Sequence, residues 1–501
     1  SIELISRAVN LSPKTAVYRC NFGKVLNHIG NLLDAEKQLK TAIELDPNLL
    51  ESYNLLGINL SSQNKLIEAK EILEQLINKA PTHINGINSL GNVYYLQSDI
   101  NNAELLFEKA NSISPDNPIT LNNLAKICVE KSQYKKAIDL FKRSSELSPN
   151  TPLIYNNLCH TYTQIRDTSS AIQYADKAIS LYPQYAEAHW NKAIALLLSQ
   201  DYINGWREFE WRLNCTRFNR ISIQDQKTKK WNCEPLAGKT LLILDEQGHG
   251  DTLQFCRYIQ MINKDSGRII LSLKKPLIDL IKKDNCIDEV IETSDTIKSE
   301  QFDYYIPLMS LPFIFKTDIS SIPNQHPYLQ SDISDHKFDQ LISSNNFNVG
   351  IVWAGNSNQK NDQNRSTSAN NFLELINSVS GKIKFYSLQK GPDESNIEIF
   401  KSKITDLSNH INDYNDTANA ISKLDLVISV CTSVAHLSGA LNKPTWVLLC
   451  HNADWRWHLD GSKTPWYPSM KLFRQRSLGN WQEVFNNIKQ DLKTLITKTN
   501  S

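Results

Sequence analysis

Small residues recur every 34 positions along the first part of the chain. One series is predicted to lie on the first helix of each repeated unit: Gly23, Gly57, Gly91, Ala125, Cys159 and Ala193. A second series is predicted on the second helix: Ala35, Ala69, Ala103, Ala137 and Ala171. Because helices cross closely only where their side chains are small, each unit is predicted to be a packed helix pair.

Prolines mark the ends of the same units, at positions 13, 47, 81, 115, 149 and 183, with a constant interval of 34 residues. This period is typical of tetratricopeptide repeats and predicts an α-solenoid. The predicted repeats are 16–49, 50–83, 84–117, 118–151 and 152–185, with a degenerate sixth from residue 186. Residues 1–15 are expected to form the last helix of a preceding repeat, and the missing initiator Met also predicts a fragment.

Beyond the repeats, short β-rich apolar segments alternate with helical patterns. The predicted strands are 240–244, 268–273, 288–292, 304–308, 348–355, 384–389, 425–430, 444–449 and 471–475. Short apolar strands separated by helices indicate doubly wound parallel sheets. The Pro-containing stretch 312–328 divides the strands into two halves, which are expected to face each other across a cleft. All ten tryptophans lie at or after Trp190, which marks this region as a different domain.

Composition narrows the function classes. The chain of 501 residues has 54 Lys plus Arg and 53 Asp plus Glu, so its formal charge of +1 gives no field suited to nucleic acid. A hydrophobic content of 41% excludes wholesale disorder. The nine cysteines form no Cys-x-x-Cys pair and are too sparse for a disulfide framework, so we expect reduced thiols and a cytoplasmic protein. The longest uncharged run is shorter than a membrane span.

In open α/β sheets ligands bind beyond the carboxyl ends of strands, so residues directly after each predicted strand are the candidates for chemistry. After the first strand, Gly248 and Gly250 permit a tight turn and Asp251 begins a helix. Asp251 is either an N-cap or a carboxylate aimed into the cleft as a general base.

A second candidate follows strand 425–430, where Cys431, Thr432 and Ser433 precede a helix that carries His436. Free N–H groups at a helix start, with adjacent hydroxyls, suit a diphosphate. The alternative is that Thr432 or Ser433 simply caps the helix and His436 is a core residue.

The loop after strand 348–355 holds Lys360 and Arg365, and an Arg can clamp phosphate oxygens. Phosphate charge would then be met by Arg365, Lys390 and the helix start at 432–433, since no metal-ligand spacing is present. Further nucleotide-binding candidates are Trp353, Gly355 and Gln389, proposed as a floor under the base; for Trp353 the alternative is core packing. Residues 454–457 either line the sugar or pack between the halves.

Long strings in the second region carry a specific resemblance. They are GWREFEWRL (205–213), DEQGHGDTLQFCRY (245–258), PLMSLP (307–312), VGIVWAGNSNQKNDQNRS (349–366), SLQKGP (387–392), CTSVAHLSGALNKPTWVLL (431–449), DWRW (454–457) and WYPSMKLFRQ (466–475). In order, they resemble bacterial tetratricopeptide-repeat proteins with a C-terminal glycosyltransferase family 9-like domain. That family looks related to the lipopolysaccharide heptosyltransferases, and the layout is similar to that of O-GlcNAc transferase.

The resemblance implies a GT-B architecture of two Rossmann-like halves and inverting, metal-independent transfer from a nucleotide sugar, with no cofactor. By motif, the role of catalytic base falls on Asp251 and the diphosphate contact on Arg365, with Gly248, His249 and Gly250 on the acceptor side. The predicted domains are a repeat superhelix (1–214), a linker (215–237), an acceptor-side half (238–335), a nucleotide-sugar-side half (336–480) and a C-terminal helix (481–501).

Two positions depart from the family pattern. Cys431 stands where the family usually has Asp, and a thiol replaces neither the charge nor the two acceptor oxygens of a carboxylate. His249 stands where the family usually has an aliphatic residue. Either change is expected to alter specificity, and the first to weaken or abolish activity.

Asparagines form two series on the first helix of the repeats. One comprises Asn54, Asn88, Asn122 and Asn156, and the other Asn123, Asn157 and Asn191. Such a ladder of amides along a concave groove can hydrogen-bond an extended peptide without reading its sequence. The alternative is that these amides bond within the repeats.

Three functions compete. The first is a glycosyltransferase whose repeats recruit a polypeptide or other macromolecular acceptor. The second is a transferase acting on a glycan or lipid-linked acceptor, with the repeats used to form a homo-oligomer. The third is a non-catalytic scaffold that binds a nucleotide sugar; Cys431 favours it, whereas Asp251 and Arg365 favour an enzyme.

Overall fold

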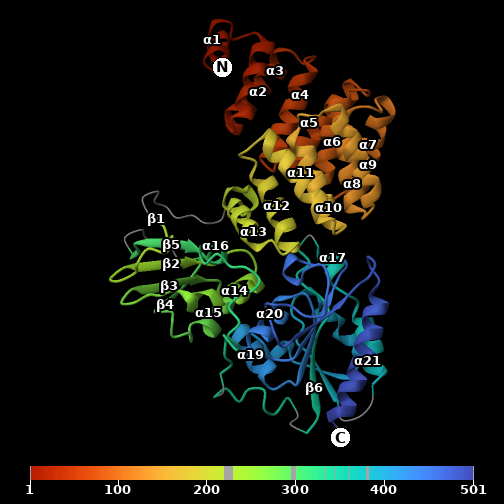
Figure 1. The fold of residues 1–501 in the computed structure, drawn as a ribbon. Helices are drawn as coiled ribbons and strands as arrows, with labels where there is room; N and C mark the ends of the chain where they lie inside the picture. The colour runs from red at the N-terminus through yellow and green to blue at the C-terminus, as the bar shows by residue number, and fades with distance from the viewer. Residues whose placement is uncertain are drawn as a thin grey trace. The chain divides into compact units, whose positions relative to one another are not determined.

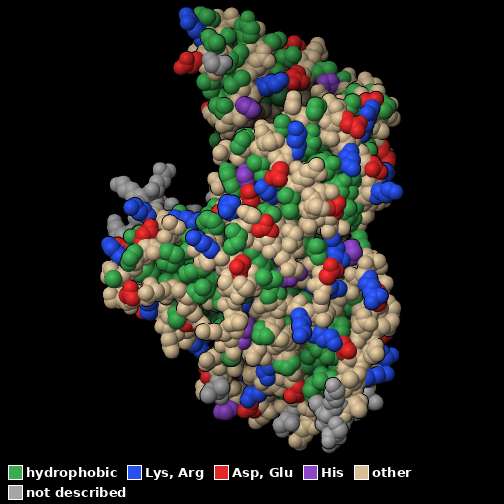
Figure 2. Space-filling view, in the orientation of Figure 1, with side chains coloured by type: hydrophobic (Ala, Val, Ile, Leu, Met, Phe, Trp, Pro, Cys, Tyr) green, Lys and Arg blue, Asp and Glu red, His purple; other side chains and the backbone are tan. Residues whose placement is uncertain are grey.

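The computed structural model describes residues 2–218, 229–294, 301–332, 334–342, 345–359, 361–379 and 383–499. The chain divides into two compact units, Ser1–Tyr185 and Ala186–Ser501. Cationic and anionic side chains are interspersed on the face of the molecule shown in Figure 2, as the nearly balanced composition predicts.

The first unit is all-helical (Figure 1). Its helices are α1 (Ile2–Leu11), α2 (Ala16–His28), α3 (Leu32–Leu45), α4 (Leu50–Ser62), α5 (Leu66–Lys79), α6 (Ile84–Leu96), α7 (Ile100–Ile113), α8 (Pro118–Glu130), α9 (Tyr134–Leu147), α10 (Pro152–Gln164) and α11 (Thr168–Leu181). From α2 onward, two helices fall in each 34-residue unit, and α1 falls within residues 1–15. The predicted solenoid of helix pairs is therefore confirmed.

Close packing explains the small-residue series. The five alanines of the second series are fully buried. A Cβ added at Gly57 would lie 2.5 Å from Leu73 Cγ, inside van der Waals contact. The first helix of each pair therefore approaches the second closely enough to exclude a larger side chain.

The second unit opens with α12 (Ala186–Leu198) and α13 (Tyr202–Phe209), followed by the 3₁₀ helix η1 (Glu210–Asn214). The unit boundary thus precedes these helices, whereas the sequence pattern predicted that the repeats extend to residue 214. They pack with the α/β part because Trp206 of α13 contacts Phe255 and Trp455 edge to face. Of the predicted linker 215–237, residues 219–228 lie outside the described residues.

Two parallel sheets form the rest of the unit (Figure 1). The first has the order β1-β5-β2-β3-β4, with β1 (Lys229–Lys230), β2 (Thr240–Leu244), β3 (Arg268–Leu273), β4 (Glu289–Glu292) and β5 (Tyr304–Pro307). The second has the order β11-β10-β9-β6-β7-β8, with β6 (Phe347–Val352), β7 (Ile383–Ser387), β8 (Ile404–Asp406), β9 (Leu426–Val430), β10 (Thr445–Leu449) and β11 (Met470–Arg474). The predicted parallel sheets are confirmed, whereas β1 and β8 were not predicted.

Helices flank these sheets. They are α14 (His249–Phe255), α15 (Lys275–Ile281), α16 (Leu311–Ile314), α17 (Asp362–Arg365), α18 (Ala369–Asn377), α19 (Tyr414–Ser422), α20 (Ser433–Ala440) and α21 (Trp481–Thr499). One apolar core joins β6 residues Val349 and Ile351 to Phe372 of α18 and Phe485 of α21. The C-terminal helix therefore packs against the second sheet.

Candidate functional site

The second sheet changes direction between β6 and β9. From β6, the chain adds β7 and β8 on one side and β9, β10 and β11 on the other. In such sheets, loops diverge at this switch point and leave a crevice at the carboxyl ends of the two strands. The segments that begin at Trp353 and Cys431 leave β6 and β9 at this crevice, so two of the predicted site segments are neighbours.

The start of α20 is not capped by its own hydroxyl groups. Thr432 is the N-cap residue, and its side chain makes no capping hydrogen bond. Its Oγ1 lies 3.0 Å from Ser429 Oγ, while Ser433 Oγ lies 2.7 Å from the Tyr414 hydroxyl oxygen. Simple capping by Thr432 or Ser433 is therefore not seen. The Ala435 N–H donates to the Thr432 carbonyl at 3.1 Å, so the Ser433 and Val434 N–H groups are the ones that can meet an anion.

Arg365 lies between the two segments. Its Nη1 donates to the Cys431 carbonyl at 3.2 Å, and its Nε bonds Asp362 Oδ1 at 2.9 Å. Gly355 faces the same guanidinium, and a Cβ at position 355 would overlap Arg365 Nη2. A positive charge held over the crevice by β6 and β9 loop groups suits a phosphate.

Gln389 and Trp353 serve the framework of the crevice. Gln389 is 1% exposed; its Oε1 accepts from the N–H groups of Trp353 and Ala354, and its Nε2 donates to the Ala354 and Lys390 carbonyls. Trp353 is 1% exposed and packs on Phe400. The expected floor under a nucleotide base is therefore corrected for Trp353: its ring lies in the core because alternate side chains of β6 point to the α18–α21 face.

Lys390 remains accessible, with 49% of its side chain exposed. Its Nζ donates to the Ser408 carbonyl at 3.0 Å and lies 3.5 Å from Glu394 Oε1. Lys360, the other cation of the predicted loop, lies outside the described residues.

The first sheet has its own switch point, between β2 and β5, and α14 follows β2. Gly248 is the N-cap of α14, and its N–H donates to Asp251 Oδ2 at 2.8 Å. Asp251 is therefore not the N-cap; it is the third helical residue, whose carboxylate turns back to the N-cap N–H. Of its two predicted roles, capping is present as this one bond from the Gly248 N–H to the Asp251 carboxylate, and the second carboxylate oxygen makes no bond to the turn.

Arg456 holds that second oxygen. From the 3₁₀ helix η8 (Trp455–Trp457), its Nη2 donates to Asp251 Oδ1, its Nη1 to Asp454 Oδ1 at 2.9 Å and its Nε to Gln254 Oε1. Burial raises the pKa of the Asp251 carboxyl, and the Arg456 charge opposes that rise. Asp251 is 20% exposed, so it is a partly buried carboxylate paired across the two sheets.

Cys431 lies at the same crevice. Its Sγ accepts a hydrogen bond from Trp457 Nε1 at 3.1 Å. Burial raises the pKa of this thiol to about 11, so it is uncharged at neutral pH. Trp455 and Trp457 are 3% and 0% exposed, so the interpretation of residues 454–457 as packing groups holds for both rings.

His436 and Gly250 bring α20 and α14 together. A Cβ at Gly250 would lie 3.0 Å from His436 Cδ2, so glycine permits this close approach. His436 Nδ1 lies 2.8 Å from the Tyr467 hydroxyl, and the ring stacks on Trp457. Burial, with three nearby arginines, lowers the pKa of His436 well below 6.5 and keeps the imidazole neutral.

Several of the distinctive strings meet in one buried ion-pair cluster, which the sequence pattern did not predict. Arg212, fully buried, forms a bidentate pair with Glu246 at 2.9 and 2.6 Å. It also donates to Glu210 Oε1 at 2.7 Å and to Ser310 Oγ at 2.9 Å. Strings 205–213, 245–258 and 307–312 are thus joined structurally, and the turn before α14 is anchored from behind.

The asparagine series bonds between adjacent repeats. Asn123 Nδ2 donates to Asn88 Oδ1 at 3.3 Å, Asn157 Nδ2 to Asn122 Oδ1 at 2.9 Å, and the Ser89 hydroxyl to Asn54 Oδ1 at 2.8 Å. Asn54, Asn88, Asn122, Asn123 and Asn156 are buried, with 3–8% exposed. The expected open ladder is therefore corrected: most of these amides support repeat stacking. Asn191 lies on α12 of the second unit.

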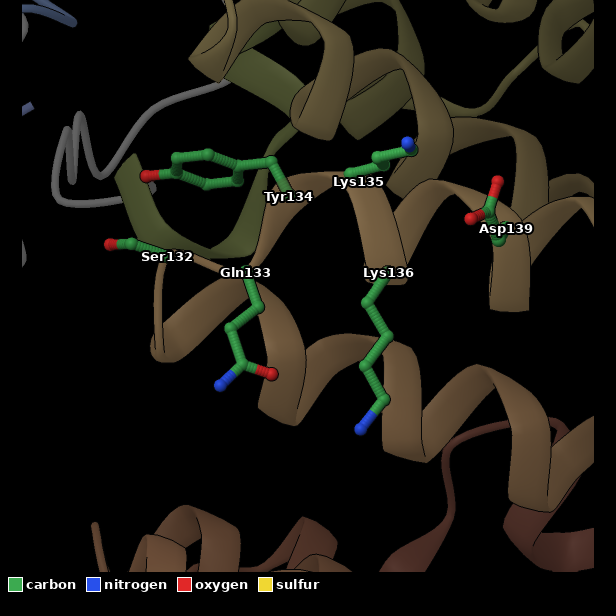
Figure 3. Close-up of a pocket in the computed structure, with 6 residues that line it drawn as sticks. All are labelled: Ser132, Gln133, Tyr134, Lys135, Lys136 and Asp139. Carbon is green, nitrogen blue, oxygen red and sulfur yellow. The ribbon is translucent and has the colours of Figure 1, made fainter. Parts of the chain in front are cut away.

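A separate hollow of about 610 Å³ opens on the first unit at the α8–α9 turn. Figure 3 shows its lining, Ser132, Gln133, Tyr134, Lys135, Lys136 and Asp139. It contains none of the predicted site residues, and the side chains of Lys135 and Lys136 point in different directions (Figure 3).

Within the described ranges, no cluster of three His, Cys, Asp or Glu side chains is placed to hold a metal ion. Across the same ranges, no helix combines the length and apolar character needed to cross a bilayer.

The tetratricopeptide repeat family model matches residues 120–151 and 153–185, which overlap α8 to α11. The first unit is a tetratricopeptide-repeat solenoid. Protein FlbA of Caulobacter vibrioides is 21% identical to this chain over 394 residues, covering 66% of this chain and 65% of that protein. This chain thus spans just under two thirds of FlbA. The matched 66% of this chain is longer than residues 1–214, so the similarity extends into the α/β region.

Solved structures are also similar to part of this chain. The Cut9–Hcn1 hetero-tetramer of the APC/C matches at 18% identity and TM-score 0.41, over 44% of each chain. TTC0263, a protein of Thermus thermophilus, matches at 19% identity and TM-score 0.35, over 36% of this chain and 100% of that one. YrrB, described as having an unusual peptide-binding site, matches at 20% identity and TM-score 0.27, over 38% and 97%.

Proposed function

We propose that this chain is a metal-independent, inverting glycosyltransferase of GT-B architecture, similar to glycosyltransferase family 9. It would move a sugar from a nucleotide-sugar donor to a polypeptide or other macromolecular acceptor that the repeats recruit. The observation that carries the proposal is the uncapped start of α20 beside Arg365, at the switch point of the second sheet. That arrangement offers N–H groups, hydroxyls and a guanidinium to a diphosphate without a metal.

Asp251 supplies the catalytic base in this proposal. Its raised pKa makes it a better proton acceptor than an ordinary aspartate, and Arg456 fixes its orientation. The acceptor oxygen would attack the anomeric carbon while its proton passes to Asp251. The bond from that carbon to the diphosphate breaks, and the nucleoside diphosphate leaves with the electron pair.

Two asparagines of the repeats favour a polypeptide as the acceptor. Asn54 and Asn122 accept through Oδ1, and their Nδ2 groups donate to no described group. These amide groups could bond carbonyl oxygens of an extended peptide. Asn122→Ala should then weaken modification of a polypeptide without changing donor hydrolysis, and equal loss of both would argue against peptide binding there.

A nucleotide-sugar-binding scaffold is the second candidate, and Cys431 favours it. An uncharged thiol bonded to Trp457 Nε1 lies where the resembling family has a carboxylate. A scaffold would bind the donor through Arg365 and the α20 start yet transfer nothing.

The test is a thermal-shift screen of nucleotide sugars, because a donor that binds only the folded protein raises its melting temperature. Arg365→Ala should weaken the binding of any hit by about 1.5 to 3 kcal/mol, the range for a charged hydrogen bond. Arg268→Ala is the matched control, since Arg268 begins β3 at the opposite end of its strand and pairs with the exposed Glu289. Equal affinity of the Arg365→Ala variant for every hit would reject the site.

A further inference from the structure

A hydrogen-bonded chain of three side chains links α14 to the start of α20. His249 Nδ1 lies 3.1 Å from the Tyr414 hydroxyl oxygen, and that oxygen lies 2.7 Å from Ser433 Oγ. The His249 ring also packs edge-on against Tyr414. His249 is one of the two positions where this sequence departs from the family pattern, so the link belongs to this chain.

The protons of this chain have two possible directions. Either Ser433 donates to Tyr414 and Tyr414 donates to His249 Nδ1, or each donation runs the opposite way. A neutral imidazole carries one proton, so the first direction places it on Nε2 and the second on Nδ1. The heavy-atom distances are the same for both directions, so only the positions of the hydroxyl and imidazole protons distinguish them.

A phosphate oxygen removes this ambiguity because it only accepts hydrogen bonds. Ser433 is the first residue of α20, at the anion site formed with Thr432 and Arg365. Once its hydroxyl donates to a phosphate, it must accept from Tyr414, and Tyr414 must then accept from His249 Nδ1–H. The Nε2 atom is left with a lone pair.

We infer that occupation of the anion site at the start of α20 sets the tautomer of His249 through Tyr414, so that Nε2 becomes a hydrogen-bond acceptor. His249 is then an acceptor-binding residue and Tyr414 a positioning residue. This inference rests on the proposed donor site. It specifies that the acceptor substrate presents a hydroxyl or N–H group that donates a hydrogen bond to His249 Nε2. It also specifies that the nucleotide sugar binds before the acceptor substrate.

The surroundings keep His249 neutral, as the relay requires. Burial and the charge of Lys274 lower the pKa of His249, while Asp245 opposes them in part. Lys274 Nζ itself bonds Asp245 Oδ2 at 2.6 Å, so these two charges largely offset each other. The Tyr414 ring on α19, which is uncharged, also packs against His249.

The experiment is ¹⁵N NMR of histidine-labelled full-length chain, titrated with inorganic pyrophosphate as the anion. The signals of His249 are those missing from the His249→Gln variant. Pyrophosphate should shift His249 toward the Nδ1–H tautomer. Tyr414→Phe should abolish this shift while still binding pyrophosphate, and Tyr467→Phe, which removes the hydroxyl bonded to His436, should preserve it.

Each result decides between the two proposals. Pyrophosphate binding that leaves the His249 tautomer unchanged, or that changes it equally in the Tyr414→Phe variant, overturns the relay and leaves the donor site standing. Pyrophosphate binding that is absent, or insensitive to Arg365→Ala, overturns the donor site and the relay together.

Discussion

Replacing Arg456 should lower the free energy of unfolding of the second unit without affecting the solenoid. Arg456→Met keeps the length and packing of the side chain but leaves Asp251, Asp454 and Gln254 without their shared donor. Breaking a buried ion pair costs about 3 to 5 kcal/mol. Asp454 is 38% exposed and Asp251 is 20% exposed, so solvent screening lowers the expected loss of unfolding free energy to about 2 to 4 kcal/mol.

Tryptophan fluorescence during urea unfolding is the suitable assay. All ten tryptophans lie at or after Trp190, so the signal reports on the second unit and not on the solenoid. The matched control is Arg476→Met, because Arg476 pairs with Glu483 while 83% exposed; it should cost under about 1 kcal/mol. Adding Asp251→Asn to Arg456→Met should recover part of the loss, since it removes an uncompensated charge. A loss for Arg456→Met no larger than for Arg476→Met would refute the reasoning.

Three further predictions concern other residues of the second unit. Asp251→Asn keeps one side-chain oxygen, which can accept from the Gly248 N–H, while Arg456 keeps Asp454 as its charged partner, so we expect transfer to fall by about 10²-fold or more in a kinetic assay with a modest fall in melting temperature; full turnover would leave Asp251 a capping residue. Burial lowers the pKa of His458 to about 4 from 6.5, so between those pH values the unfolded state binds more protons. Stability of the second unit should therefore fall as pH drops from 6.5 to 4, by at most roughly 3 kcal/mol from this group, and urea titrations should show a shallower fall for His458→Gln. Cys431→Asp offers Trp457 Nε1 a better acceptor; it should fold and raise transfer, whereas weaker, salt-sensitive donor binding by calorimetry would mean that the site is tuned to the thiol.

The sequence was sufficient for elements with strong periodicity. Prolines and small residues at a 34-residue interval fixed the helix pairs, and apolar runs such as 426–430 located the central strands. Strands β1 and β8 were missed because Lys-Lys and Ile-Thr-Asp carry almost no hydrophobic pattern. Their pairing depends on a neighbouring strand that only the tertiary structure supplies.

For the site, the residues directly after the predicted strands included the starts of α14 and α20. These positions could be predicted because parallel strands place their carboxyl ends at one edge of a sheet. The sequence did not reveal the pairing of Asp251 with Arg456, which are 205 residues apart, nor the hydrogen bonds of Tyr414. Trp353 and Gln389 follow strands like the other candidates, yet alternation and internal bonding turn both side chains inward. Their burial could be learned only from the packed fold.

The most direct test of the central claim is turnover of the donor at this crevice. A nucleotide sugar that stabilises the folded chain should be incubated with wild type and with Asp251→Asn, and released nucleoside diphosphate and modified polypeptide measured by mass spectrometry. The account predicts metal-independent release and sugar addition by wild type, both strongly reduced in Asp251→Asn at unchanged donor affinity. A wild-type chain that binds the nucleotide sugar but neither transfers nor hydrolyses it, across a broad acceptor panel, would contradict the account and identify a scaffold.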